Sequence, residues 1–249
     1  MPDRVWVVPA NDGEAVEILR LLGERGEHVL QTHQRWGASW AALEPEILAA
    51  VANGAHKVEQ IYGVELAGPN AYGAINIDHH RYAEDDRWRP ESSLEQVAVI
   101  LGVPLDRHRL LVAANDRGYI PAMEALGASP EEIEEVRAAD RAAQGLTVDD
   151  RVHAERDIAK ADWLGKRVAV SCPNGVTSWH SDLLYGKATE WLLMAPTMWL
   201  YSGDRREDFE RLALSEPHWS GGEAAHGYSV VASPSPESQR KIRELFFTH

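Results

Sequence analysis

Short apolar runs alternate with helical patterns over the first hundred residues. Runs typical of buried strands occur at 5–8, 28–30, within 58–66 and at 74–77. Apolar residues at helical spacing predict helices over 14–22, 44–51 and 93–101, the last with Ser92 or Ser93 as its N-cap. Because strands that alternate with helices form parallel sheets flanked by helices, the pattern predicts an α/β domain.

The pattern changes twice further along the chain. Residues 117–163 are predicted to be almost wholly helical, with a strong helix start at Ser129-Pro130-Glu131-Glu132. The charges Glu134, Glu135 and Arg137 are interpreted as a solvated helix face. Strands are then predicted at 167–171, 191–194 and 198–201, and helices at 208–214 and 237–246. We therefore expect a larger domain over 1–150, a helical connector to about 163, and a smaller α+β domain over 164–249.

Composition narrows the classes of protein and partner. The net charge is −14, from 39 acidic and 25 basic residues, which argues against a long nucleic acid as partner. No apolar run reaches the ~18 residues of a membrane span, and the first residues lack a secretory signal pattern. The single Cys172 excludes an intrachain disulfide. We expect a cytoplasmic protein without a membrane partner, and a homodimer on base rates alone.

Acidic and histidine residues follow several apolar runs. Asp12 and Glu14, then Glu65, then Asp78-His79-His80 follow strand-like segments, and Asn115-Asp116 follows the apolar run 110–114. Ligands of open α/β sheets bind beyond the carboxyl ends of the strands, so these groups are expected to converge. Carboxylates with imidazole suit Mn²⁺, Mg²⁺ or Zn²⁺. Taken singly, each cluster has a plain alternative, since an Asp after a strand is often a helix cap.

The order of these clusters resembles the DHH phosphoesterase superfamily. The name-giving motif is present as Asp78-His79-His80. The family's other acids have counterparts in order along the chain, at Asp12, Glu14, Glu65 and Asp116. Its Ser-rich helix start corresponds to Ser92-Ser93. The resemblance implies a metal-binding α/β domain followed by a smaller domain that covers the substrate.

The resemblance also implies roles for these residues. Metal ligands would be Asp12, Glu14, Glu65, His79 and Asp116, and catalytic groups would be His80, Asp78 and Asp116. The implied cofactor is one or two divalent ions, manganese first, with magnesium, zinc or iron as alternatives. The implied reaction is hydrolysis of a small phosphorylated molecule or nucleotide by metal-activated water.

Substrate-binding candidates are expected mainly in the second half. The segment 219–228 contains Gly221, Gly222 and His226 and resembles the family's glycine-rich substrate loop, with a hairpin turn as the alternative interpretation. Arg117, Arg205 and Arg206 are candidate phosphate clamps.

Departures from the family pattern leave other functions open. Val8 stands where the family has a histidine, so one metal site is expected to be altered or lost, unless His33 or His56 supplies the missing ligand. One alternative is a nuclease for very short oligonucleotides, whose bases could stack on some of the nine tryptophans. Another is a catalytically reduced DHH-like module that binds a nucleotide or metal and regulates another process.

Overall fold

Two units make up the chain, and each is built around its own sheet. The computed structural model describes residues 4–54, 60–70, 72–82, 85–212, 216–222 and 227–247. The first unit comprises residues 1–80 and 84–145, and the second comprises 81–83 and 146–249. The division after Gly145 lies earlier than the predicted boundary near 150–165, because the helix over 148–158 packs within the second unit.

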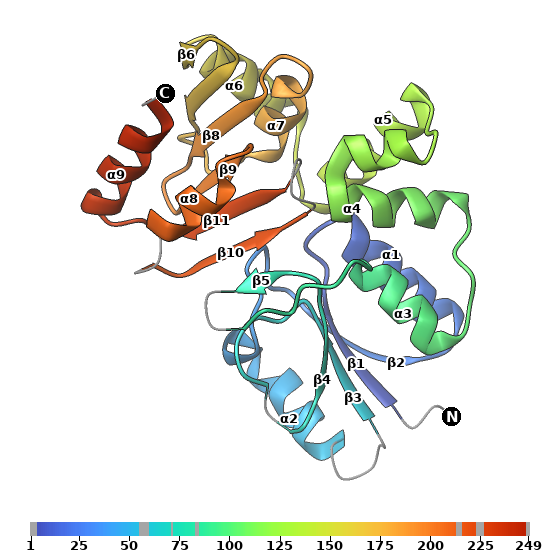
Figure 1. Cartoon of the computed structure of the whole chain (residues 1–249). Coiled ribbons are helices and arrows are strands. Elements are labelled where there is room, and N and C mark those ends of the chain that lie inside the picture. The colour runs from blue at the N-terminus through green and yellow to red at the C-terminus, as the bar shows by residue number, and fades with distance from the viewer. Residues whose placement is uncertain are drawn as a thin grey trace. The chain divides into compact units, whose positions relative to one another are not determined.

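A parallel four-stranded sheet forms the centre of the first unit. Its strand order is β2-β1-β3-β4, with bounds β1 Arg4–Pro9, β2 His28–Thr32, β3 Gln60–Val64 and β4 Ile75–Ile77. Helix α2 (Pro45–Gly54) lies on one side of this sheet, and α1 (Gly13–Glu24) and α3 (Ser93–Leu101) lie on the other (Figure 1). The predicted α/β fold with a helix-flanked parallel sheet is therefore confirmed.

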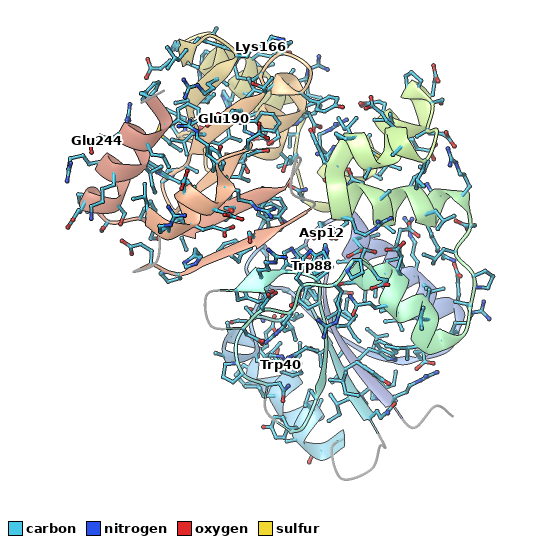
Figure 2. The ribbon with its side chains drawn as sticks, viewed as in Figure 1. Asp12, Trp40, Trp88, Lys166, Glu190 and Glu244 are labelled. Carbon is cyan, nitrogen blue, oxygen red and sulfur yellow. The ribbon has the colours of Figure 1, made fainter. Side chains whose placement is uncertain are left out.

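Strand β1 is buried on both faces, as central parallel strands are. Trp6 stacks on Tyr62 with ring centroids 4.3 Å apart, while Val7 belongs to the core on the α2 side. Trp40, from the short 3-10 turn Trp40–Ala42, packs in that same core (Figure 2). A Cβ on Gly63 would lie 2.1 Å from Cζ2 of Trp40, so only glycine fits there. These contacts fix the strands whose ends carry the candidate site.

The apolar run 110–114 is helical. It lies within α4 (Arg107–Ala125), which Asp106 caps by accepting a hydrogen bond from the Arg109 N–H at 2.9 Å. The prediction that Asn115-Asp116 follows a strand end is therefore wrong. A short apolar run suits a buried helix segment as well as a strand, so its pattern alone does not separate the two. The helix is kinked just after Asp116, where Tyr119 has a φ of 59°.

Helix α5 (Pro130–Ala143) begins as predicted, with a capping box between Ser129 and Glu132. Glu134 and Glu135 are exposed, as predicted for a solvated face. Arg137 is buried, so its assignment to that face is wrong. The Arg137 guanidinium lies 4.8 Å from the Tyr119 ring centroid. Because α5 packs on α1 and α4, part of its polar face turns inward, where this guanidinium finds partners.

The second unit contains a seven-stranded mixed sheet in the order β5-β10-β11-β9-β8-β7-β6. The strands are β5 Arg81–Tyr82, β6 Asp162–Leu164, β7 Arg167–Ser171, β8 Glu190–Met194, β9 Met198–Ser202, β10 His218–Gly221 and β11 Tyr228–Ala232. Among the described strands of this sheet, only β7 and β8 are parallel neighbours. The strands predicted at 167–171, 191–194 and 198–201 are confirmed, whereas β5, β6, β10 and β11 were not predicted.

Helices cover both faces of this second sheet. One core contains Leu184 of α7 (Ser178–Leu184) and is contacted by Ile158 of α6 (Val148–Ile158). The other contains Phe209 of α8 (Arg206–Leu212) and Phe246 of α9 (Pro236–Phe247), at the helices predicted over 208–214 and 237–246. None of the helices in the described parts of the chain is long and apolar enough to cross a membrane.

Candidate metal centre

The carboxyl ends of β3 and β4 bring Glu65 and His79 together. Glu65 directly follows β3, and its N–H donates to the carbonyl of Ile77, the last residue of β4, at 2.9 Å. The φ of Glu65 is 49°, a left-handed conformation that costs free energy in a residue with a side chain and that concentrates at functional sites. Nε2 of His79 lies 3.4 Å from Oε1 of Glu65.

Two further acids complete a group of four. Glu14 reaches it from the first turn of α1, and Asp116 from α4. Ligand atoms of Glu14, Glu65, His79 and Asp116 all lie within 4.8 Å of one another, and those of Glu65, His79 and His80 form a second such group. Glu14 and His79 are each only 3% exposed. The structure thus brings together four of the five predicted metal ligands.

Several polar atoms of this group lack hydrogen bonds. Oε2 of Glu14, Nε2 of His79 and Oδ2 of Asp116 are buried and have no hydrogen-bond partner. The last two atoms are 2.6 Å apart, but their approach lacks the alignment of a hydrogen bond. Buried polar atoms are ordinarily bonded, and oxygen and imidazole nitrogen atoms that converge in this way are what a divalent cation coordinates. The residues present therefore fit a divalent metal ion.

Without a cation, burial drives protons onto three of the acids. Burial and the neighbouring charge of Glu65 raise the pKa of Asp12 to about 7. Burial raises the pKa of Glu14 well above its ordinary range, and the charges of Asp116 and Glu65 add to this. Burial does the same to the pKa of Asp116, again with Glu65 contributing. A cation in the group would take the place of these protons.

The histidines keep the remaining acids ionised. Burial alone would raise the pKa of Glu65, but contact with His79 and the charge of His80 outweigh it, and the pKa is lowered. Burial likewise opposes ionisation of Asp78, but hydrogen bonds and charge from His80 lower its pKa. Burial lowers the pKa of His79, yet Glu65 and the other acids raise it to about 9. Without a metal ion, the centre therefore contains the carboxylates of Glu65 and Asp78 beside the protonated imidazole of His79. A metal ion that binds His79 would displace its proton.

Asp12 has a different position from the group of four. It is the N-cap of α1, and its Oδ1 accepts a hydrogen bond from the Ala15 N–H at 2.8 Å. Asp12, labelled in Figure 2, is 8% exposed. The charges of Glu65, Asp140 and His80 affect its pKa. The helix cap, which the sequence left open as an alternative, is thus observed. Its role as a metal ligand stays a prediction.

Asp78 orients the second histidine of its motif. Its Oδ1 accepts a hydrogen bond from the His80 N–H at 3.0 Å and lies 2.9 Å from His80 Nδ1. With a donor on Nδ1, the other ring nitrogen, Nε2, is the basic one. Asp78 therefore contacts both the backbone N–H and the ring of His80. Its role in catalysis stays a prediction.

The missing histidine of the first motif is not replaced among the described residues. Val8 is fully buried in β1. His33 belongs to neither of the two groups close enough to hold a metal ion in the described parts of the chain. His56 lies outside the described residues. The described centre therefore draws on carboxylates and the two histidines of the Asp78-His79-His80 motif.

The predicted phosphate clamps have partners within their own units. Nε of Arg117 lies 3.0 Å from Oε2 of Glu95 in the first unit. In the second unit, Nε of Arg205 donates to Glu190 at 3.0 Å. Arg206 donates to the carbonyl groups of Gly221 and Gly222 at 3.3 and 3.2 Å, and His226 lies outside the described residues. Their predicted roles toward a substrate stay predictions.

Three residues around the centre were missed by reasoning from the sequence. Ser93 donates its hydroxyl to Oε1 of Glu65 at 2.9 Å. Asp140 of α5 accepts the N–H of Gly13 at 2.9 Å. Arg87 is buried and lies 3.3 Å from Oδ2 of Asp78. Ser93 follows a recognisable helix cap, but Asp140 and Arg87 have no local pattern that would mark them.

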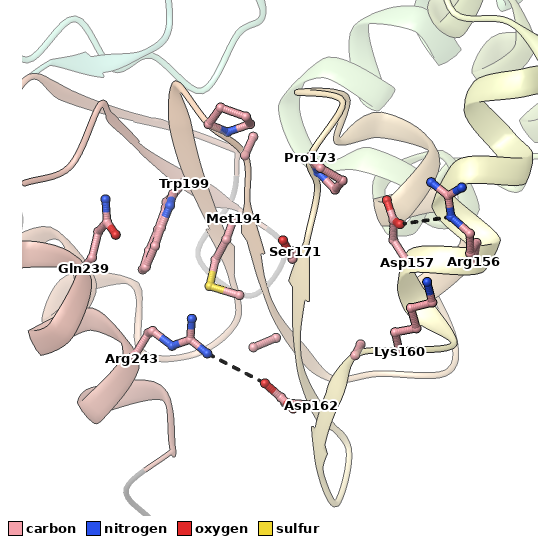
Figure 3. A pocket seen from close by; sticks show the side chains of 14 residues that line it. Arg156, Asp157, Lys160, Asp162, Ser171, Pro173, Met194, Trp199, Gln239 and Arg243 are labelled. Carbon is pink, nitrogen blue, oxygen red and sulfur yellow. Dashed lines mark ion pairs between the residues drawn. The ribbon is translucent and has the colours of Figure 1, made fainter. Parts of the chain in front are cut away.

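The second unit has a cavity of about 700 Å³ beside α9 (Figure 3). Charged side chains at its rim form two ion pairs, Arg243 with Asp162 at 3.8 Å and Arg156 with Asp157 at 3.7 Å. Trp199 and Met194 contribute apolar lining. None of the described residues that line it belongs to the predicted site.

Known proteins resemble this chain in structure only. The sequence matches no family model and no curated protein. The structure is similar to PggH, a pGpG-specific phosphodiesterase from Vibrio cholerae, at 13% identity and a TM-score of 0.37, over 97% of this chain and 96% of that one. It is also similar to RecJ from Thermus thermophilus in complex with Mn²⁺, at 15% identity and a TM-score of 0.46. That match covers 97% of this chain but 52% of RecJ, so the chain spans about half of RecJ's length.

A third similar structure is the DHH domain of a protein described as a member of a family of ribosomal proteins. It is 11% identical, with a TM-score of 0.48, over 98% of this chain and 85% of that one. At 11–15% identity the likeness concerns the fold alone, and no activity follows from it for this chain.

Proposed function

We propose that this protein is a metal-dependent hydrolase that acts on a phosphate ester of a small molecule or nucleotide. The observation that carries the proposal is the group formed by Glu14, Glu65, His79 and Asp116, with ligand atoms within 4.8 Å of one another. Burying three carboxyl groups together without a cation costs free energy, and the pKa values of two of them, Glu14 and Asp116, are raised well above their ordinary range. Such a cost is typical of a functional site.

The four residues of this group would hold the metal, with Asp12 as a further candidate. A divalent cation bound there would polarise a phosphoryl oxygen and lower the pKa of a bound water molecule. Carboxylates with imidazole suit Mn²⁺, Mg²⁺, Zn²⁺ or Fe²⁺, and the sequence resemblance favours Mn²⁺ among them. Glu65 and His79 belong to both groups of candidate ligands, so these residues would form the core of the site.

His80 is assigned to proton transfer. Its Nδ1 is held by Asp78 at 2.9 Å, so the proton it exchanges with the substrate would be on Nε2. Its side chain is 12% exposed, whereas that of His79 is 3% exposed. The more accessible imidazole therefore suits contact with substrate, and the more buried one suits metal binding.

Metal content is the first test. The purified protein, incubated with Mn²⁺ and desalted, is measured by elemental mass spectrometry beside His79→Ala and the control His28→Ala, since His28 is exposed on β2. We expect one or two ions per chain in the wild type and in His28→Ala, with a clear loss in His79→Ala. Absence of bound metal in the wild type would overturn the proposal and favour a module without metal chemistry.

Turnover separates the remaining alternatives. The metal-loaded protein is assayed for phosphate or nucleotide release from a mononucleotide, a dinucleotide and a short single-stranded RNA, beside His80→Ala. Cleavage of the mononucleotide, lost in His80→Ala, supports the small-molecule phosphoesterase. Preference for the dinucleotide or the RNA supports the short-oligonucleotide nuclease. Metal binding without turnover of any phosphate ester supports a regulatory module.

A further inference from the structure

Arg87 is a buried cation in the loop that leads to α3. It is only 7% exposed. Its Nη1 donates to the carbonyl of Leu66 at 2.8 Å and its Nη2 to that of Gly68 at 2.7 Å. Nη1 also donates to Oδ2 of Asp78 at 3.3 Å, and Nε donates to Asp85. One guanidinium therefore binds two separate segments of the chain.

These contacts lie next to two residues of the candidate centre, Glu65 and His79. Leu66 directly follows Glu65, and Asp78 directly precedes His79. The backbone N–H of Arg87 adds a third attachment by donating to the carbonyl of His80 at 3.1 Å. The segments after β3 and β4 are thus held to each other by the same side chain. The contacts of Arg87 with Leu66 and Gly68 stabilise the backbone next to Glu65, whose φ of 49° is unfavourable without support from its surroundings.

We propose that Arg87 is a positioning residue that sets the spacing between Glu65 and His79, and thereby the affinity of the centre for its metal ion. The inference rests on the proposed function for the metal itself, and on the hydrogen bonds of Arg87 for the positioning. Residues that orient metal ligands typically change metal affinity by about 10- to 100-fold when mutated.

The role requires an arginine. Burying a cation is costly unless it is paired, and Asp78 supplies the opposite charge while the two carbonyl groups use further N–H donors. The planar guanidinium directs its donors at fixed angles, whereas a lysine ammonium is a compact point charge that cannot reach the same acceptors together. Arg87→Lys is therefore expected to retain the charge but lose the simultaneous hold on both segments.

Isothermal titration with Mn²⁺ tests this with Arg87→Lys, Arg87→Met and the control Arg89→Met. Arg89 is exposed in the same loop, and its Nη1 donates to the carbonyl of Trp88. We expect both Arg87 variants to bind Mn²⁺ about 10- to 100-fold more weakly than the wild type, with Arg87→Met the weaker. Arg89→Met is expected to bind like the wild type. Wild-type affinity in Arg87→Lys and Arg87→Met would overturn the proposal.

A measurement on the metal-free protein separates the positioning role of Arg87 from the proposed metal binding. The ring ¹⁵N signals of His79 and His80 in the metal-free protein should shift in Arg87→Lys, because their segment loses its anchor, and should stay in place in Arg89→Met. If the wild type binds no metal, the metal function fails. Shifted histidine signals would then still support positioning by Arg87, and unshifted signals would overturn it.

Asp85→Asn serves if the Arg87 variants do not fold. It removes one charged partner of Arg87 and keeps the guanidinium, so a smaller shift in the same histidine signals is expected. No shift would overturn the positioning role.

Discussion

Glu14 accepts a hydrogen bond from the backbone N–H of Leu94, with 3.0 Å between Oε1 and N. Leu94 lies in the first turn of α3, where backbone N–H groups have no partner within the helix. The other oxygen of the same carboxyl group, Oε2, is buried and has no hydrogen bond. One side chain therefore joins the starts of α1 and α3 and still presents an oxygen atom to the candidate metal centre.

Glu14→Gln separates these two functions of the side chain. The amide oxygen can still accept from Leu94, while the negative charge is lost. We expect the melting temperature of the metal-free variant to equal or exceed that of the wild type, because a buried carboxyl with a raised pKa is removed. Calorimetric titration should show Mn²⁺ binding at least ~10-fold weaker.

The matched control for this change is Glu135→Gln, an exposed carboxyl on α5. It should leave both the melting temperature and the Mn²⁺ affinity unchanged. Equal Mn²⁺ affinity in Glu14→Gln and the wild type would remove Glu14 from the set of metal ligands.

The pH dependence of stability should report on Asp12. Its pKa in the folded, metal-free protein is about 7 against an ordinary 3.8, so its contribution to stability is complete below pH 3.8 and is lost as pH rises through about 7. Asp12→Asn keeps an N-cap residue but does not titrate. We expect the melting temperature of the metal-free wild type to fall, relative to Asp12→Asn, as the pH rises from 3.8 through about 7.

Mn²⁺ should counter this trend. Metal binding needs deprotonated ligands, so it should release protons and strengthen as the pH rises. Titrations in two buffers of different ionisation enthalpy would count the protons released. A wild-type melting temperature that keeps a constant difference from that of Asp12→Asn over this pH range would contradict the raised pKa of Asp12.

Gly63→Ala tests the close packing on the α2 side of the first sheet. The new Cβ would lie 2.1 Å from Cζ2 of Trp40, so the indole ring or the strand must move. We expect a loss of ~1–3 kcal/mol in the free energy of unfolding, measured by denaturant titration.

Gly23→Ala is the matched control, because a Cβ there meets nothing within 4 Å in α1. It should instead stabilise the protein by about 0.5–1 kcal/mol, as alanine does relative to glycine within a helix. If Gly63→Ala were as stable as the wild type, the packing of Trp40 against β3 would be wrong.

Arg137→Met should destabilise the first unit. Arg137 donates to Asn115 at 3.1 Å and to Asp140 at 2.8 Å, and the methionine would leave the buried Asp140 carboxylate without its cation. We expect a loss of ~3 kcal/mol in the free energy of unfolding. Arg240→Met, at an exposed ion pair on α9, should change it by less than about 0.5 kcal/mol. A similar small effect for both variants would show that Arg137 is not held as described.

The strands and the acids at their ends could be predicted because their signals are local. Glu65 and Asp78-His79-His80 directly follow apolar runs, and a run of this kind beside glycine and helix-cap signals indicates a buried strand. Asp116 was predicted as a site residue from the sequence resemblance, although it stands on a helix. Five apolar residues in a row suit either element, and contacts with distant segments decide between them.

The residues that hold the centre in place could not be predicted. Arg87 and Asp140 act through partners that the fold alone brings near, such as Gly68 and Gly13. Charged residues in a loop or on a helix are mostly solvated, so the pattern around each of them favours the surface. Their burial follows from tertiary packing, which no short stretch of sequence records.

Strand β5 limits how the protein can be divided. Arg81 and Tyr82 follow His80 directly, yet they pair with Trp219 and Ser220 of β10 in the other sheet. A fragment that ends at Gly145 would keep β5 but lose its hydrogen-bonding neighbour, leaving an exposed strand edge one residue from the candidate metal centre. Splitting or grafting the first unit therefore calls for redesign of residues 81–83 as well as a cut after 145.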